Sequence, residues 1–125
     1  MLIKIKNAQN AGHSNATFQS SRMKSDIAEV LKSAGYITDY ENKKKKGRKG
    51  ELDFLDIKLK YTDGEGVISG VNMISTQSRR IYAGKGELFK LGRKGVTVLS
   101  TSLGIMTNKT AAARGVGGEV MFEIW

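Results

Sequence analysis

Apolar residues recur at helical spacing in two segments of the first half of the chain. Residues 1–12 place them on one helical face, and Gly12 follows as a stop. Residues 22–34 do so more strongly, with Ser20 or Ser21 as a cap and Gly35 where the helix should end. The two predicted apolar faces hold Leu2, Ile3, Ile5 and Ala8, and Met23, Ile27, Val30, Leu31 and Ala34.

Strand signals surround these helices. Residues 15–19 form a weak strand pattern, and residues 36–41 form a second one. Apolar residues alternate with polar ones from Leu55 to Tyr61, which predicts a half-buried strand. The basic run at residues 43–50 has no apolar anchor, so we expect an exposed loop or hairpin tip across which this strand pairs back.

The second half is richer in strands. A turn at residues 62–66 is the candidate boundary between two lobes. The chain is therefore expected to be α+β, with an αβαββ lobe at 1–62 and a mostly β lobe with one short helix at 66–125. In the second lobe we expect strands at 67–74, 79–83, 96–100 and 119–125, a helical turn at 87–90, and a helix at 109–114 capped by Thr107 or Asn108.

The charge of the chain favours a polyanionic partner. Its 125 residues include 21 Lys or Arg and 12 Asp or Glu, a net charge of +9. Nucleic acid is the first candidate and an anionic membrane the second, while a merely soluble basic surface is the plain alternative. The chain has no Cys, and no segment reads as a signal or a membrane span. We therefore expect a soluble protein of the cytosol or an organelle matrix.

The parts of common enzymes are missing from the sequence. His13 is the only His, and without Cys a Ser–His or Cys–His pair or a transition-metal site has few candidates. Asp53 and Asp56 should lie on opposite faces of a strand as solvated charges. The glycines at 64, 66 and 70 do not have the spacing of a dinucleotide loop. We expect neither catalysis nor a cofactor or metal.

Two features suit RNA. Basic residues are dispersed along the chain, and each can neutralise a phosphate. The hydroxyl cluster, which is Ser100, Thr101 and Ser102, follows an apolar strand and is small enough to enter the shallow minor groove of RNA. Its plain alternative is to turn the chain and cap the next helix. The dispersed cations are Lys4, Lys6, the run at 43–49, Arg79, Arg80, Lys90, Arg93, Lys94, Lys109 and Arg114.

The C-terminal sequence resembles a known family. It reads Ser-Thr-Ser-Leu-Gly-Ile-Met-Thr at 100–107 and Gly-Val-Gly-Gly-Glu-Val at 115–120, and it closes on Trp125. This closely resembles the signature of the eighth family of bacterial-type small-subunit ribosomal proteins. Matches at 5–8 and at 80–82 extend the resemblance over essentially the whole chain.

The resemblance implies a structural constituent of the small ribosomal subunit. Members bind the central domain of the small-subunit rRNA as primary binders and aid assembly beside neighbouring small-subunit proteins. In some bacteria they also repress translation of their own operon's messenger. The chain's own mRNA is therefore the alternative partner, in a free translational regulator. The implied location is the ribosome, in the cytoplasm or an organelle, with no membrane partner.

The resemblance also implies particular contacts. The hydroxyl cluster would lie in the minor groove of a distorted rRNA stem. Gly118 and Glu119 would line the same surface, with the glycines letting the backbone approach RNA closely, and Tyr82 would lie beside them. A neighbouring stem would be held through its phosphates by Lys4, Lys6 and Lys60, and the dispersed charges Arg80, Lys109 and Arg114 complete the expected set.

The chain departs from the family pattern at several points. Leu103 stands where Lys or Arg is common, and Asn108 stands where Asp is usual. The turn before Arg80 lacks the usual Pro and Gly. Members usually begin several residues earlier, so we expect the first helix to be less firmly held here. The run at 43–49 is more basic than is typical, and we expect it to compensate or bind further rRNA.

Overall fold

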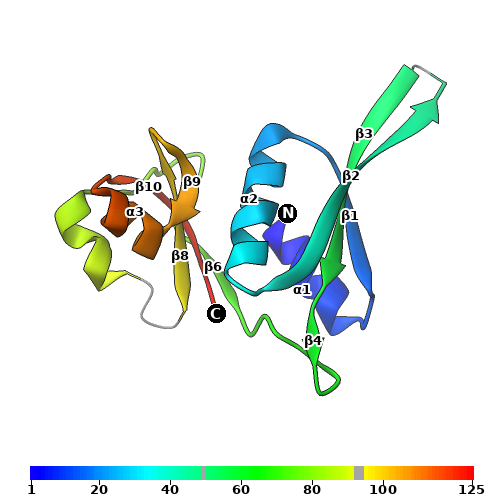
Figure 1. The fold of residues 1–125 in the computed structure, drawn as a ribbon, viewed down its shortest axis with the longest axis horizontal. Coiled ribbons are helices and arrows are strands. Elements are labelled where there is room, and N and C mark those ends of the chain that lie inside the picture. Colours follow the sequence, from blue (N-terminus) through cyan, green and yellow to red (C-terminus); the bar gives the residue numbers. More distant parts are fainter. Residues whose placement is uncertain (49, 92–94) are drawn as a thin grey trace. The chain divides into compact units, whose positions relative to one another are not determined.

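A computed structural model describes residues 1–48, 50–91 and 95–125 of the chain. The fold consists of two compact units, Met1–Ile68 and Ser69–Trp125 (Figure 1). The division falls shortly after the turn at 62–66. Helices and strands are mixed in the first unit and strands dominate the second, so the α+β class predicted from the pattern is confirmed. Three of the predicted cations, Lys49, Arg93 and Lys94, lie outside the described residues.

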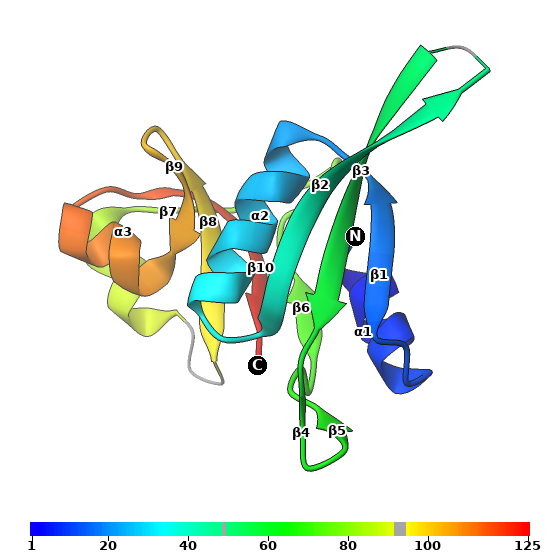
Figure 2. The same ribbon diagram turned by 45° about the vertical axis from the view of Figure 1, so that its right-hand side comes forward.

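The first unit is a three-stranded antiparallel sheet with two helices. Strand β3 is the middle strand, in the order β1-β3-β2, and a small β4–β5 hairpin follows it. The helices and the three longer strands can be followed in Figure 2. The elements are α1 (Leu2–Asn10), β1 (Asn15–Gln19), α2 (Arg22–Ser33), β2 (Ile37–Gly47), β3 (Gly50–Leu59), β4 (Tyr61–Thr62) and β5 (Glu65–Gly66).

Both helices cover the same face of this sheet. Leu55 and Ile57 of β3 are fully buried on that face, as the alternating pattern predicted. Tyr40, the register partner of Ile57, donates a hydrogen bond from its hydroxyl to Glu29 of α2. Phe18, the register partner of Leu55, carries the Lys4 ammonium of α1 4.9 Å above its ring. The opposite face of the sheet therefore holds the polar residues of the strands.

The two predicted helices form, but their buried faces differ from the prediction. In α2 the Ser21 hydroxyl accepts the Lys24 N–H at 3.2 Å, as an N-cap should. Met23, expected in the apolar face, is 55% exposed because it lies in the first turn, while Ala28 is fully buried. In α1 the polar side chain of Gln9 is buried, and Ile3 is exposed.

The basic run is not a loop. Strand β2 continues through Lys46, and each of its residues from Tyr40 onward has a partner in β3 down to the pair Gly47 and Gly50. The expectation of an exposed loop was wrong because ladder hydrogen bonds join backbone groups and need no apolar side chain. The hairpin alternative is confirmed, because β3 pairs back along β2 across this end. The run is exposed wherever its side chains are described.

The second unit is a five-stranded antiparallel sheet. Strand β10 pairs with β6, β7 and β8, and β8 pairs with β9. No helix among the described residues is long and apolar enough to cross a membrane. The elements are β6 (Val71–Met73), β7 (Tyr82–Ala83), the 3-10 helix η1 (Lys85–Lys90), β8 (Val96–Thr101), β9 (Gly104–Thr107), α3 (Asn108–Arg114) and β10 (Gly118–Ile124).

The strands expected at 67–74 and 79–83 are shorter in the structure. Ile68 bonds with the side chain of Gln9, and the Ser69 and Gly70 amides both donate to the Trp125 carbonyl. The backbone groups of residues 68–70 thus bond with these partners and do not form regular strand pairs. In the other segment, the Ile81 N–H donates to the Ser75 hydroxyl instead of to a strand. Strand β9 was not predicted at all.

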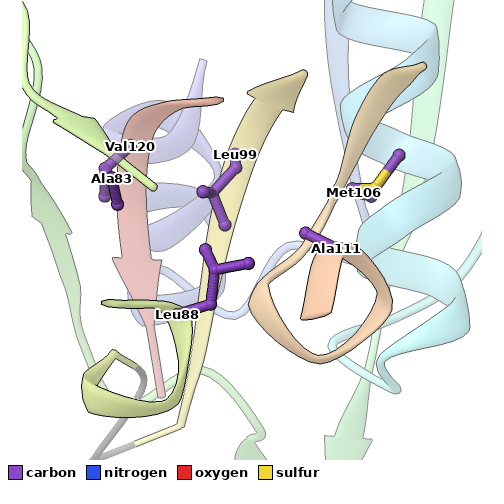
Figure 3. Close-up of a cluster of buried hydrophobic side chains, with 6 residues drawn as sticks. All are labelled: Ala83, Leu88, Leu99, Met106, Ala111 and Val120. Carbon is purple, nitrogen blue, oxygen red and sulfur yellow. The ribbon is translucent and has the colours of Figure 1, made fainter. Parts of the chain in front are cut away.

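One face of the second sheet carries a compact apolar core. Leu99 of β8 and Val120 of β10 are register partners, and both side chains are buried. Leu88 of η1 and Ala111 of α3 pack over them, so the two helices cover this face (Figure 3). The next residues along the strands, Ser100 and Glu119, therefore point to the opposite face.

Candidate nucleic-acid interface

The hydroxyl cluster lies where β8 turns into β9. Thr101 pairs with Gly104, which leaves Ser102 and Leu103 at the turn. The Thr101 hydroxyl donates to the Gly104 carbonyl at 2.8 Å and accepts the Leu103 N–H at 3.1 Å. The Thr101 hydroxyl therefore stabilises the turn, as the first part of the alternative reading expected, while the cap of the next helix is Thr107.

The two serines differ from Thr101. Within the described part of the chain, the hydroxyls of Ser100 and Ser102 make no hydrogen bond, and Ser102 is exposed. Leu103 beside it is also exposed. The end of β8 and the turn after it thus carry two hydroxyl groups without an internal bond, and each can both donate and accept.

A polar row lies on the face of the sheet away from the core of η1 and α3, whereas Val98 further along that face is buried. Ser100 is the register partner of Glu119, and Glu119 is the register partner of Tyr82. The Glu119 carboxylate accepts a hydrogen bond from the Arg80 guanidinium at 2.9 Å, and this contact raises the pKa of Arg80. The structure thus brings four of the predicted residues, Ser100, Glu119, Tyr82 and Arg80, onto one surface.

Gly118 has a structural reason to be glycine. A Cβ atom built on it would lie 2.3 Å from the Ser100 carbonyl oxygen, and one on Gly117 would lie 2.4 Å from the Ala83 oxygen. Both contacts are with backbone, which cannot move aside as a flexible side chain can. The close approach that these glycines permit is therefore an approach between strands of the protein itself.

The turn before Tyr82 is held by the hydroxyl of Ser75. The Ser75 hydroxyl donates to the Val120 carbonyl and accepts the Ile81 N–H at 3.0 Å. Thr76 and Arg79 bond with each other across the bend. Tyr82 itself is 69% exposed. Sequence reasoning missed Ser75, whose only signal was a hydroxyl residue next to a turn.

Lys109 and Arg114 are not part of the polar row. Both are exposed residues of α3, which packs by Ala111 onto the other face of the sheet. The Thr107 hydroxyl caps this helix by accepting the Thr110 N–H at 3.2 Å, as predicted. Gly115 ends it with a φ of 70°.

The three remaining predicted cations belong to the first unit. The Lys4 ammonium donates to the Thr17 carbonyl at 2.9 Å, and the Lys6 ammonium donates to the Ile68 carbonyl at 3.0 Å. Lys60 is exposed after the end of β3. Lys4 and Lys6 thus serve the fold, although each keeps its positive charge near the surface.

The expectation that Asp56 is a solvated charge was wrong. Its side chain is only 8% exposed and forms an ion pair with Lys43 at 3.2 Å. Asn15 and Thr17 also donate to its carboxylate. Asp56 is buried because β3 is flanked by a strand on each side. Among the described residues, no three His, Asp or Glu groups are placed to hold a metal ion.

These features define a class of protein. A small, strongly basic α+β chain with free hydroxyls beside an ion-paired strand face is suited to bind a polyanion through its surface. The model of the family described as Ribosomal protein S8 matches residues 1–125, and the chain belongs to this family.

Curated relatives agree with this membership. The chain is 45% identical to the small ribosomal subunit protein uS8 of Caldicellulosiruptor bescii, with 100% of this chain and 93% of the relative covered. It is 42% identical to the protein of the same name from Ruminiclostridium cellulolyticum, with the same coverage. The uS8 protein of Corynebacterium jeikeium is 44% identical, again over 100% of this chain and 93% of the relative.

Proposed function

We propose that this chain is a structural constituent of the small ribosomal subunit and a primary binder of the central domain of its rRNA. Membership of the ribosomal protein S8 family supports the first part. The free hydroxyls of Ser100 and Ser102 carry the second. A primary binder contacts the rRNA directly. Its binding would therefore aid assembly of the subunit, in which it would lie beside neighbouring ribosomal proteins.

The hydroxyl pair is the specific part of the contact. The minor groove of an A-form helix is wide and shallow and displays 2′-OH groups and base edges. Ser102 at the tip of the turn is short enough to reach them, and it loses no internal bond by doing so. Thr101 holds the turn in shape, and Tyr82 and Glu119 extend the surface along the polar row.

The test is a gel shift with a central-domain rRNA stem and a scrambled stem of equal length. Ser102→Ala should weaken binding to the native stem by about 1–3 kcal/mol, because a hydrogen bond to a buried partner is lost. Ser33→Ala removes a hydroxyl from an exposed position of α2 and serves as the matched control.

The outcomes separate specific from general binding. Tight binding of the native stem alone, reduced only by Ser102→Ala, supports the proposal. Equal and strongly salt-sensitive binding of both stems would mean that charge alone acts, and the proposed groove contact would be abandoned.

A further inference from the structure

Most cations on the body of the first unit are already bonded within the protein. Lys32 and Lys58 form ion pairs with carboxylates of β2. Lys24, like Lys4 and Lys6, donates to a backbone carbonyl. Lys43 pairs with the buried Asp56. The charge of these residues is therefore largely engaged in holding the fold.

The end of the β2–β3 hairpin is different. We call residues 43–48 and 50–53 the basic ribbon; they include five Lys or Arg and two acidic residues, and so carry three of the nine net positive charges. Lys44, Lys46 and Arg48 are exposed, and within the described residues they take part in no ion pair or hydrogen bond. Their charges are free for an external partner.

The basic ribbon extends beyond the rest of its sheet. Strand β1 pairs with β3 only from Phe54 to Lys58, whereas β2 follows β3 out to Gly50. The Asp53 carbonyl still accepts the Ser20 N–H, but beyond Asp53 strand β3 is paired on one side only. The two strands project past α2 and β1 in Figures 1 and 2. Such a ribbon is accessible along its edges and on its faces.

We propose that the basic ribbon binds the phosphates of an RNA helix as a second contact, separate from the hydroxyl cluster. This inference rests on the proposed function. Lys44 and Lys46 lie on one face of β2, about 7 Å apart along the strand, and Arg48 follows at the tip. A line of separate cations suits the regular phosphates of a nucleic-acid backbone. The acidic residues Asp53 and Glu51 are the register partners of Lys44 and Lys46, and the cations of the ribbon outnumber them.

A membrane fits the basic ribbon less well than RNA. Stable binding to a bilayer surface adds buried apolar area to the attraction of the cations. Among the described side chains of the ribbon, Leu52 is the exposed large apolar one. Contacts from Lys and Arg to phosphates carry no sequence information. The basic ribbon should therefore strengthen binding and its salt dependence without changing which RNA is chosen.

The experiment compares two triple variants that remove the same charge. Lys44→Gln, Lys46→Gln and Arg48→Gln together remove the free cations of the ribbon, and Lys32→Gln, Lys58→Gln and Lys85→Gln remove three cations elsewhere. The affinity of the full chain for a central-domain rRNA fragment is measured over a salt series. The ribbon variant should lower the slope of log affinity against log salt by about two to three, since each phosphate contact contributes about 0.9. The control should lower it by less than about one.

Three results would overturn or separate the two proposed contacts. An unchanged slope in the ribbon variant, or an equal loss in both triples, overturns the ribbon contact. Ser102→Ala in the same series tests the proposed function separately, because it should reduce the preference for the native stem and leave the slope unchanged. Preferential, ribbon-dependent binding to phosphatidylserine vesicles over RNA would also overturn the inference.

A second measurement locates the contact directly. The chain has no Cys, so a single Cys can carry a tethered RNA-cleaving probe. The probe at Arg48→Cys should cut the bound RNA at defined positions, while the probe at Lys32→Cys should not cut there. The absence of any cut from position 48 in the bound complex would refute the contact.

Discussion

At the scale of single residues, Gln9 shows how a polar side chain can be part of a core. Its amide nitrogen donates to the Ile68 carbonyl at 2.7 Å, and its amide oxygen accepts the Ile68 N–H at 3.1 Å. A Cβ atom on Gly66 would lie 1.9 Å from the Gln9 side chain, so glycine leaves the space for it. Gln9 is buried because both of its polar groups are satisfied.

Replacement of this residue should destabilise the fold. Gln9→Ala leaves the buried Ile68 N–H without its partner, while the Ile68 carbonyl keeps its bond from Lys6. We expect a loss of about 1–3 kcal/mol in the free energy of unfolding, measured with urea. The exposed Gln19→Ala control should change it by less than about 0.5 kcal/mol. Equal stability of the two variants would contradict this account.

Asp39 should titrate at a low pH. The Tyr40 N–H donates to its carboxylate at 2.8 Å, and Lys32 lies 3.1 Å away; both lower the pKa of Asp39. The stabilisation is therefore present above the ordinary carboxyl pKa of about 3.9 and is lost as pH falls through the lower folded value.

An NMR titration of the side-chain carboxyl carbon measures this shift. Lys32→Gln should raise the pKa of Asp39 part of the way back to the ordinary carboxyl value. The remaining lowering is due to the bond from the Tyr40 N–H, which is the larger cause. A wild-type Asp39 that titrates like an unstructured Asp would show that the described contacts do not form in solution.

At the scale of elements, the pairing of β8 with β10 positions the candidate site. Gly118→Ala would force its new methyl group against the Ser100 carbonyl oxygen. We expect a loss of about 1–3 kcal/mol in stability and weaker binding of the native stem, because Ser100 must shift.

The matched control for this change lies in the same unit. A Cβ atom added to Gly84 would meet no other atom within 4 Å, so Gly84→Ala should alter stability by less than about 0.5 kcal/mol. Urea unfolding and the gel shift measure both variants. If Gly84→Ala were the more harmful of the two, strand proximity would not be the reason for glycine at 118.

At the scale of the whole molecule, the net charge of +9 governs how strongly any RNA is bound. Raising the salt from about 50 to 200 mM should lower the affinity for native and scrambled stems alike, by about a thousandfold if six phosphates are neutralised. The ratio of the two affinities should stay nearly constant, because hydroxyl contacts carry no net charge. A ratio that collapsed with salt would assign the specificity to the cations.

The pattern of the sequence was sufficient for most elements. Both amphipathic helices, the alternating strand of Leu55 and Ile57, and the capped helix α3 follow from local spacing and end signals. The pattern failed where bonds come from distant residues. Residues 67–70 were expected in a strand, but Gln9 and Trp125 take their backbone bonds. No pattern within residues 67–70 indicates that these distant residues bond with their backbone.

The sequence by itself determined the charge, the α+β class and the family resemblance, because these depend on composition, period and an ungapped run of residues. Only the tertiary structure decided which polar groups are free. Thr101 and the neighbouring serines look alike in sequence, yet the Thr101 hydroxyl is bonded within the turn and those of Ser100 and Ser102 are not. Likewise, Lys43 pairs with a buried Asp56 while Lys44 stays free. The physical reason is that turns and strand pairing decide which groups meet in space, and a free hydroxyl or cation is one whose neighbours in space offer it no bond.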